Sequence, residues 1–239
     1  MMNVTSRLAG VLSLAAMGIG FPHQAAASII YNLSADWSTT QNPNGAWSYR
    51  QGAAALTYPV SNWSSVADGW AASSAVYPPF WLKFNTTFVN AAAGDVAVHS
   101  SNFADPLGNL TWTSPVSGLI DIAGQAWDVQ HYPNRDDSWS LFLNSTLIAS
   151  RSSIYGILKN SDNANFANNL SAGQSLTGLA VSVNDVVTFQ VQRDPKYESG
   201  HFTGVALTLT TYAAPEPGSL ALMGLGLAGA MFSRRRISG

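Results

Sequence analysis

The sequence predicts an all-β protein, an antiparallel β-sandwich of the jelly-roll type, with a targeting segment at each end. Three observations lead to this prediction. Apolar and polar residues alternate in many short runs within residues 28–214. Turn-forming Gly, Pro and Asn separate these runs, and the runs lack the 3.6-residue period of a helix. Short strands joined by tight turns are typical of two packed antiparallel sheets.

The composition limits the function classes. The 239 residues are 46% hydrophobic and only 10% charged, with a net charge of −2 and no cysteine. The charged fraction lies far below the ~25% of ordinary soluble domains, and an uncharged polar surface suits an extracellular β-protein. A net charge this close to zero provides no positive electrostatic potential to attract nucleic acid, so we expect no nucleic-acid partner. Without cysteine the chain has no disulfides, zinc–thiolate sites or cysteine nucleophiles.

The first 27 residues are predicted to be a secretory signal peptide. Arg7 supplies the positive start, residues 8–21 are apolar, and Ala25–Ala27 provides the small side chains of a cleavage site. The alternative, an uncleaved anchor, is disfavoured because the apolar stretch is shorter than the ~20 residues of a membrane span. We therefore expect passage through the secretion translocon and one mature domain, residues 28–214, of ordinary domain length.

The mature segment is predicted to be a succession of short strands. In residues 137–143, Trp139 and Leu141 fall on one side and two serines on the other, which is the period of a half-buried strand. Residues 204–212 alternate in the same way. The expected strands, in chain order, are 28–33, 46–50, 81–84, 95–99, 110–113, 119–127, 137–143, 146–150, 181–183, 186–192 and 204–212.

Turn residues separate these strands. Asn42–Gly45 is a turn because Asn and Gly tolerate positive φ and Pro fixes its own. Asn144–Ser145 occupies the place of a two-residue hairpin turn. Asn184–Asp185 is expected to join residues 181–183 and 186–192 as a second antiparallel pair. The order of strands in the sheets does not follow from these turns.

The last twenty-five residues form a segment with three parts. The first part contains two prolines, which fix φ and interrupt a strand, so it is an extended and accessible joint. Residues 218–232 carry no charge and are apolar on every side, which suits a short membrane helix. The arginines that follow are expected to stay on the cytoplasmic side. The residues of this sorting motif are Pro215, Glu216, Pro217, Arg234, Arg235 and Arg236.

This layout resembles the PEP-CTERM sorting signal of Gram-negative bacteria, and the resemblance covers residues 214–236 with every part in order. In that family an exosortase, a membrane cysteine transpeptidase, recognises the signal. The resemblance implies that an exosortase is a partner and that the C-terminal helix holds the protein in the inner membrane before processing. It also implies a final place at the cell surface or outside the cell. The family's association with exopolysaccharide and biofilm production implies a matrix role.

A second resemblance concerns the mature domain. Residues 42–49, 98–99 and 110–118 look like β-sandwich domains found in PEP-CTERM proteins, which are similar to carbohydrate-binding modules. This chain departs from that pattern near its last strand, where His201–Gly204 replaces a motif that contains aspartate. The resemblance therefore implies the fold and suggests a glycan ligand, while its motifs are structural.

Aromatic side chains are the first candidates for binding. An exposed aromatic ring offers a flat apolar face to a sugar ring, although most tryptophans are largely buried. Trp residues that alternate within strands are expected in the core. Trp63 and Trp70, in a polar stretch that is expected to be a loop, and Tyr132, in another, are the candidate ligand-binding residues.

The most polar cluster is the segment 128–137. Its hard oxygen donors, Asp128, Asn134, Asp136 and Asp137, form a candidate calcium site, because calcium prefers several carboxylate and carbonyl oxygens. The spacing is not that of an EF-hand. A solvated loop, in which an arginine pairs with an aspartate, is the alternative.

The sequence gives little support for an enzyme. The histidines are scattered, and neither a Gly-x-Ser-x-Gly nor a His-Glu-x-x-His motif occurs. Glycoside hydrolysis needs paired carboxylates, which the sequence does not pair, and a polysaccharide hydrolase or lyase stays a disfavoured alternative. We therefore expect a non-catalytic exported protein. Two hypotheses stay open, a module that binds exopolysaccharide and a structural matrix protein without a specific ligand.

Overall fold

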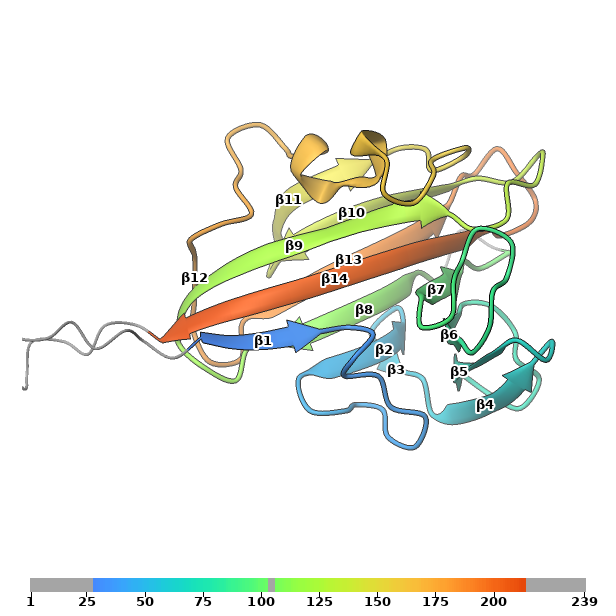
Figure 1. Cartoon of the computed structure of the whole chain (residues 1–239), viewed down its shortest axis with the longest axis horizontal. Helices are drawn as coiled ribbons and strands as arrows, with labels where there is room; N and C mark the ends of the chain where they lie inside the picture. The colour runs from blue at the N-terminus through green and yellow to red at the C-terminus, as the bar shows by residue number, and fades with distance from the viewer. Residues whose placement is uncertain (1–27, 103–105, 214–239) are drawn as a thin grey trace, which may run out of the picture.

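The computed structural model describes residues 28–102 and 106–213 (Figure 1). The predicted signal peptide and the sorting motif from Pro215 onward lie outside these ranges. Among the described residues, no helix has the length and apolar character that crossing a membrane requires.

Regular structure in the described ranges is almost entirely β-strand, with two 3₁₀ helices of three residues each, so the all-β prediction is confirmed. The elements in chain order are β1 (Ser28–Asn32), β2 (Trp47–Gln51), β3 (Ala54–Ala55), β4 (Tyr58–Trp63), β5 (Ala67–Ala71), β6 (Phe80–Phe84), β7 (Val96–His99), β8 (Gly108–Thr113), β9 (Gly118–Asp128), β10 (Asp137–Leu143), β11 (Thr146–Arg151), η1 (Asp162–Ala164), η2 (Phe166–Asn168), β12 (Leu179–Val181), β13 (Val186–Arg193) and β14 (Phe202–Ala213).

The strands form two antiparallel sheets. The larger sheet has eight strands, in the order β12–β9–β14–β7–β6–β5–β4 with β1 added beside β14. The smaller sheet has six strands in the order β11–β10–β13–β8–β2–β3. Buried side chains from both sheets form one hydrophobic core. The prediction of packed antiparallel sheets is therefore confirmed.

β9 and β14 form the long spine of the larger sheet. Eleven residue pairs run from Gly118 opposite Ala213 to Asp128 opposite Thr203. At about 3.4 Å per residue, this ladder extends over roughly 34 Å. β1 pairs with the last part of β14, so Ser28 also lies at the Ala213 end. We call this end of the domain the tail end, and the opposite end, where Asp128 lies, the distal end (Figure 1).

Tryptophans that alternate within strands are in the core, as predicted. Trp47, Trp112 and Trp139 are all buried. The Trp112 ring of the smaller sheet makes an edge contact with Tyr31 of the larger one, with ring centroids 5.3 Å apart. Aromatic rings thus provide the largest side chains of the core, in a chain that has no cysteine for disulfides.

The predicted pairing of residues 181–183 with 186–192 is wrong. β12 pairs with β9 in the larger sheet, whereas β13 pairs with β10 and β8 in the smaller one. The turn at Asn184, which has a φ of 74°, carries the chain from one sheet to the other. Turn residues determine where the chain reverses, but they do not determine which strand the next segment pairs with.

The stretch around Trp63 and Trp70, which the sequence predicts to be a loop, is a hairpin, β4–β5, inside the larger sheet. β5 packs so closely on β6 that a Cβ at Gly69 would fall 2.0 Å from the Trp81 carbonyl oxygen. Pro59 and the polar tip of this hairpin disguise the strand period in the sequence.

Candidate functional site

The three aromatic residues that the sequence proposed for ligand binding do not form one surface. Trp70 is only 4% exposed, and its indole N–H donates a hydrogen bond to the Ser38 carbonyl at 2.8 Å. Its proposed exposure is therefore corrected, because β5 is an inner strand of the sheet. Tyr132 is 49% exposed at the distal end.

Trp63 is half-buried at the rim of the core. Its ring lies against three phenylalanines, with centroid separations of 5.8 Å to Phe80, 5.9 Å to Phe88 and 5.3 Å to Phe202. These contacts hold the indole as part of the core. Among the predicted aromatic residues, Tyr132 alone presents its ring freely to solvent.

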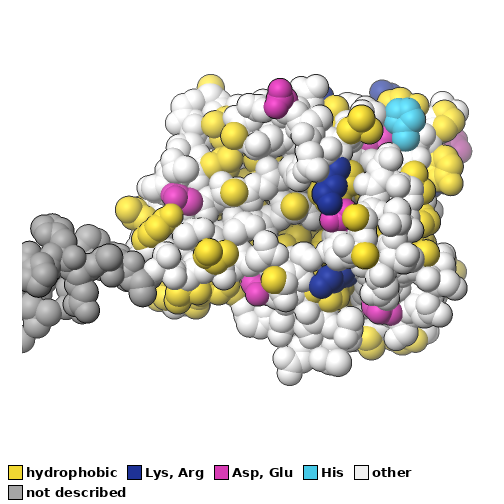
Figure 2. Space-filling view, in the orientation of Figure 1, with side chains coloured by type: hydrophobic (Ala, Val, Ile, Leu, Met, Phe, Trp, Pro, Cys, Tyr) yellow, Lys and Arg dark blue, Asp and Glu magenta, His cyan; other side chains and the backbone are white. Residues whose placement is uncertain are grey.

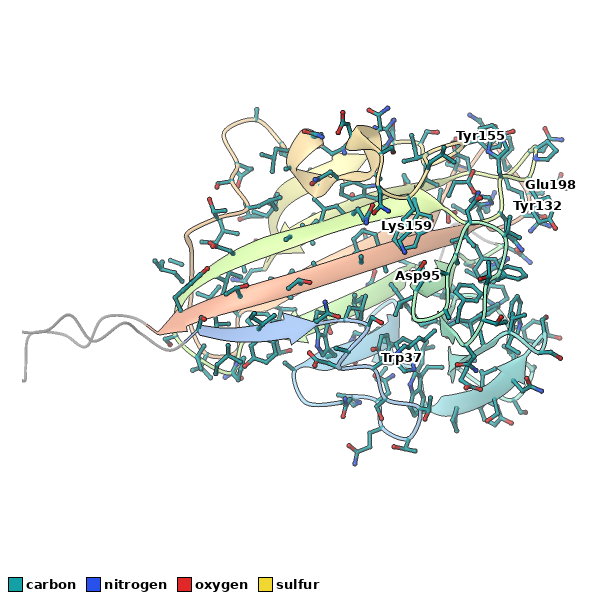
Figure 3. All side chains as sticks on the ribbon, viewed as in Figure 1. Trp37, Asp95, Tyr132, Tyr155, Lys159 and Glu198 are labelled. Atoms are coloured by element: carbon teal, nitrogen blue, oxygen red, sulfur yellow. The ribbon has the colours of Figure 1, made fainter. Side chains whose placement is uncertain are left out.

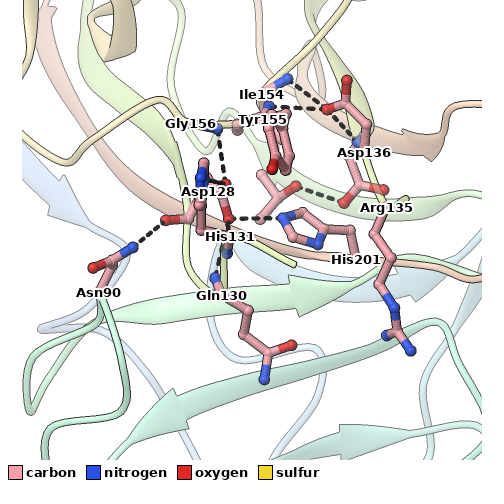
Figure 4. A network of polar contacts seen from close by, with 12 residues as sticks. Asn90, Asp128, Gln130, His131, Arg135, Asp136, Ile154, Tyr155, Gly156 and His201 are labelled. Carbon is pink, nitrogen blue, oxygen red and sulfur yellow. Dashed lines mark hydrogen bonds and ion pairs between the residues drawn. The ribbon is translucent and has the colours of Figure 1, made fainter. Parts of the chain in front are cut away.

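The distal end is organised by a buried carboxylate at the last residue of β9. Oδ1 of Asp128 lies 2.7 Å from Nε2 of His201 and accepts the backbone N–H groups of His131 and Gln130. Oδ2 accepts the Gly156 N–H at 2.8 Å and lies 3.1 Å from Nδ1 of His131 (Figure 4). Burial alone would raise the pKa of Asp128, but the hydrogen bonds from His201, Gly156 and His131 outweigh burial and bring the pKa down to about 2.

A second buried carboxylate, that of Asp136, holds the loop after β11. Oδ1 accepts the N–H groups of Ile154 and Tyr155, each at 2.9 Å, and that of Asp137 at 2.8 Å. Oδ2 accepts the Ser153 hydroxyl at 2.5 Å. The backbone of Tyr155 is therefore fixed by a carboxylate that is itself almost inaccessible (Figure 4).

The third carboxylate, Asp137, is fully buried between the sheets. It accepts the Ser100 hydroxyl at 2.6 Å and the Thr203 hydroxyl at 2.7 Å. Burial raises its pKa to about 7, although these two hydrogen bonds and the nearby His201 act in the opposite direction. Two hydroxyl donors thus replace the water that Asp137 loses on folding.

Above this buried network lies an exposed aromatic cluster. The rings of His131 and Tyr155 are stacked, with centroids 4.4 Å apart and planes inclined by 22°. Tyr155 is 42% exposed, and Tyr132 follows His131 directly in the chain. We call His131, Tyr132 and Tyr155 the distal aromatic cluster; Figure 3 shows both tyrosines, and also Glu198, at the distal end.

Polar groups border the distal aromatic cluster. The Arg135 guanidinium lies 5.6 Å from the centroid of the Tyr132 ring and donates a hydrogen bond to the Gly200 carbonyl at 3.1 Å. Asn134 is exposed on the same loop. Amide and guanidinium groups can donate hydrogen bonds to hydroxyls, and the amide can also accept them. Rings and polar groups together form a surface suited to a ligand with an apolar face and many hydroxyls.

Sequence reasoning found part of this site. It selected Tyr132 and the polar segment, but it missed His131 and Tyr155 as a stacked pair. Tyr155 comes from a different loop, and the side chains of Asp128 and Asp136, together with backbone hydrogen bonds, bring the two loops together. The sequence contains no local signal for that long-range arrangement.

The four proposed calcium ligands do not converge on a metal site. Asp128, Asp136 and Asp137 are buried, and their oxygens accept hydrogen bonds from the protein itself, while Asn134 occupies an exposed loop position. No group of three acidic, histidine or cysteine side chains within the described ranges is arranged to hold a metal ion. In the described structure the three aspartates accept hydrogen bonds from the protein's own groups, and calcium binding stays a prediction.

The comparison with family models matches the PEP-CTERM protein-sorting motif over residues 213–236. The match spans the predicted motif from Pro215 to Arg236, so the prediction of a PEP-CTERM sorting signal is confirmed, while the roles of its individual residues stay predictions. Neither the curated proteins nor the solved structures contain a match to the chain, so the likeness of the domain to carbohydrate-binding modules stays a prediction. The chain carries a PEP-CTERM sorting signal, which implies export, transient membrane anchoring through the C-terminal segment and processing by an exosortase.

Proposed function

We propose that this protein is a non-catalytic component of the surface or extracellular matrix of a Gram-negative bacterium, and that it binds exopolysaccharide through the distal aromatic cluster. The observation that carries the proposal is the stacked pair of His131 and Tyr155, exposed on two loops that buried aspartates hold in place. A binding surface whose rings are already fixed loses little conformational entropy when a ligand arrives.

The position of the cluster also supports this function. The sorting signal leaves the domain at Ala213, and the cluster follows Asp128 at the other end of the same ladder, roughly 34 Å away by strand geometry. A protein that is held at its tail end therefore presents the cluster outward, where matrix polysaccharide lies. This arrangement is suited to a role in biofilm.

The burial of the acidic residues supports a role in binding over one in catalysis. The pair of His201 and Asp128 and the pair of Ser100 and Asp137 have the residue types of hydrolytic dyads. All four residues are nevertheless buried. Catalytic groups must be within hydrogen-bonding reach of the substrate. We therefore assign these pairs to the stability of the distal end.

The competing function is a structural matrix protein without a specific ligand. The burial of Trp70 and the packing of Trp63 favour it, because fewer rings are exposed than a large sugar-binding surface would need. A glycan-array screen of residues 28–214 distinguishes the two functions. Selective binding to one class of polysaccharide supports the proposal, and binding to none of the glycans assigns the domain to the structural class.

A further inference from the structure

We propose that the tail end of the domain lies against the lipid bilayer while the protein is still anchored. The residues concerned are exposed apolar side chains, and we call them the tail-end patch: Ile29, Ile30, Leu119, Val183 and Tyr212, which are 37% to 65% exposed. Figure 2 shows apolar side chains gathered at the end of the domain from which the chain continues.

Strand register brings these residues together. Tyr212 lies opposite Ser28 on one side and opposite Leu119 on the other. The next residues along β1 are Ile29 and Ile30. Val183 joins the group through its N–H, which donates to the Ser117 hydroxyl at 3.1 Å, two residues before Leu119. Side chains alternate along a strand, so Ile30, Leu119 and Tyr212 share the outer face of the larger sheet, while Ile29 lies on its other face. The patch therefore surrounds the tail end of the sheet.

The length of chain beyond β14 indicates that the lipid bilayer is what covers the tail-end patch. Only four residues, 214–217, separate Ala213 from the uncharged run that begins at Gly218. A fully extended chain covers at most ~3.6 Å per residue, so the tail end stays within about 20 Å of that run. The predicted signal peptide joins the domain at Ser28, at the same end. Both membrane-directed segments thus bring the tail-end patch to the bilayer.

The chemistry of the patch fits the apolar side of a membrane interface. The segments that form it, residues 28–32, 114–121, 179–186 and 208–213, contain Asp121 and Asp185 but no Lys or Arg. The Tyr212 hydroxyl donates to Asp121 at 3.0 Å, which leaves its ring beside the aliphatic side chains. Tyrosine is enriched where membrane meets water, and apolar faces hold proteins in that zone. Binding is therefore expected from apolar burial, without attraction to anionic lipid.

The absence of cysteine allows a direct test on the full-length precursor, produced in a host without an exosortase and reconstituted into phosphatidylcholine vesicles. An environment-sensitive fluorophore is attached to Ile30→Cys and, as the matched control, to Glu198→Cys at the distal end. The probe at position 30 is expected to show blue-shifted emission, and lipids that carry a quencher on the head group are expected to quench it. The probe at position 198 is expected to show neither effect. Equal, unquenched emission at the two positions would overturn the proposal.

A second variant separates contact from simple tethering. Adding Leu119→Asp to the Ile30→Cys precursor is expected to abolish the quenching while the circular dichroism spectrum stays unchanged. Quenching that persists in this variant would show that the tether alone keeps position 30 near the bilayer, and would refute the contact. Quenching that rises with anionic lipid would equally refute a contact made by apolar burial. This test does not involve glycan, so its outcome is independent of the proposed function.

Discussion

At the scale of single residues, the buried carboxylates show how the sequence misleads. Asp128, Asp136 and Asp137 belong to a segment whose polarity suggests a solvated loop or a calcium site. In the folded chain they are buried, and each accepts hydrogen bonds from residues distant in the sequence. The partner of Asp128, His201, is 73 positions away. The residue types were visible in the sequence, but their burial depends on strand pairing and could not be predicted.

The raised pKa of Asp137 gives a prediction about pH. In the folded chain its pKa is about 7, against an ordinary value of 3.8. The folded state therefore keeps a proton that the unfolded state releases, so the contribution of Asp137 to stability decreases as pH rises from about 4 to 7. In Asp137→Asn this decrease is absent. The difference in free energy of unfolding, wild type minus variant, is expected to fall across this range, at a slope of at most ~1.4 kcal/mol for each step of one in pH.

Urea denaturation at a series of pH values measures this difference. Burial lowers the pKa of His99 to about 4, so its stabilising effect is lost as pH falls from 6.5 toward 4. Because wild type and variant both contain His99, the comparison between them removes this contribution. Asp162→Asn, at an exposed position, is the matched control for the loss of one carboxyl group. A constant difference for Asp137→Asn would contradict the buried, protonated state.

At the scale of elements, strands with a strict alternation of apolar and polar residues were predictable, as was a partner across a tight turn, but partners distant in the sequence were not. The alternation of Trp139 and Leu141 identifies β10 and its buried face. The Asn144 turn closes the predicted hairpin of β10 with β11. β12 joins β9 because burial of Val181 in the larger sheet decides its place, which no local pattern reports. The β4–β5 hairpin escaped prediction for another reason, because Pro59 and the polar tip disguise its strand period.

One side of the sandwich is closed by the segment that contains η1 and η2. It bridges the two sheets through isolated pairs of Gln125 with Asn165 and of Ala149 with Leu170. Phe166 of η2 is buried, and its ring lies 5.0 Å from that of Trp139. The sequence predicts no element in this stretch, although it completes the core.

Gly124 of β9 permits this closure, which gives a second prediction. A Cβ at position 124 would fall 2.3 Å from the Ala206 carbonyl oxygen and 2.5 Å from the Phe166 ring. Gly124→Ala is therefore expected to destabilise the domain by about 1–3 kcal/mol, as overpacking does in other cores. Chemical denaturation measures the loss. The control Ala123→Ser, at the exposed neighbouring position, should stay within about 0.5 kcal/mol of wild type. Equal stability of the two variants would show that η2 does not need the glycine.

At the scale of the whole molecule, the two ends of the β9–β14 ladder differ in the residues that they expose. The tail end carries both chain ends of the domain and the exposed apolar patch. The distal end carries the aromatic cluster on its buried network. The sequence predicted the sorting signal in full because its signal is local and linear. It could not predict that the binding candidate and the signal lie at opposite ends.

The sorting signal itself is tested by Glu216→Ala. Export across the inner membrane should be unchanged, because the predicted signal peptide is left intact, while processing by the exosortase should stop. The unprocessed protein is expected to keep its C-terminal segment and to remain in the membrane fraction on immunoblots. Glu198→Ala, which changes an exposed glutamate of the domain, is the matched control and should be processed normally. Release of Glu216→Ala at the normal size would refute the role of this residue.

Co-sedimentation of residues 28–214 with exopolysaccharide from the source bacterium tests the central claim most directly. Wild type is compared with Tyr132→Ala combined with Tyr155→Ala, and with Tyr77→Ala, which removes another exposed tyrosine. Each stacking ring is expected to contribute roughly 1–3 kcal/mol, by analogy with aromatic stacking on bases. The double variant should therefore lose most of the bound fraction without a change in melting temperature, and Tyr77→Ala should bind like wild type. Equal sedimentation of all three proteins, or none for wild type, would contradict glycan binding by the distal aromatic cluster.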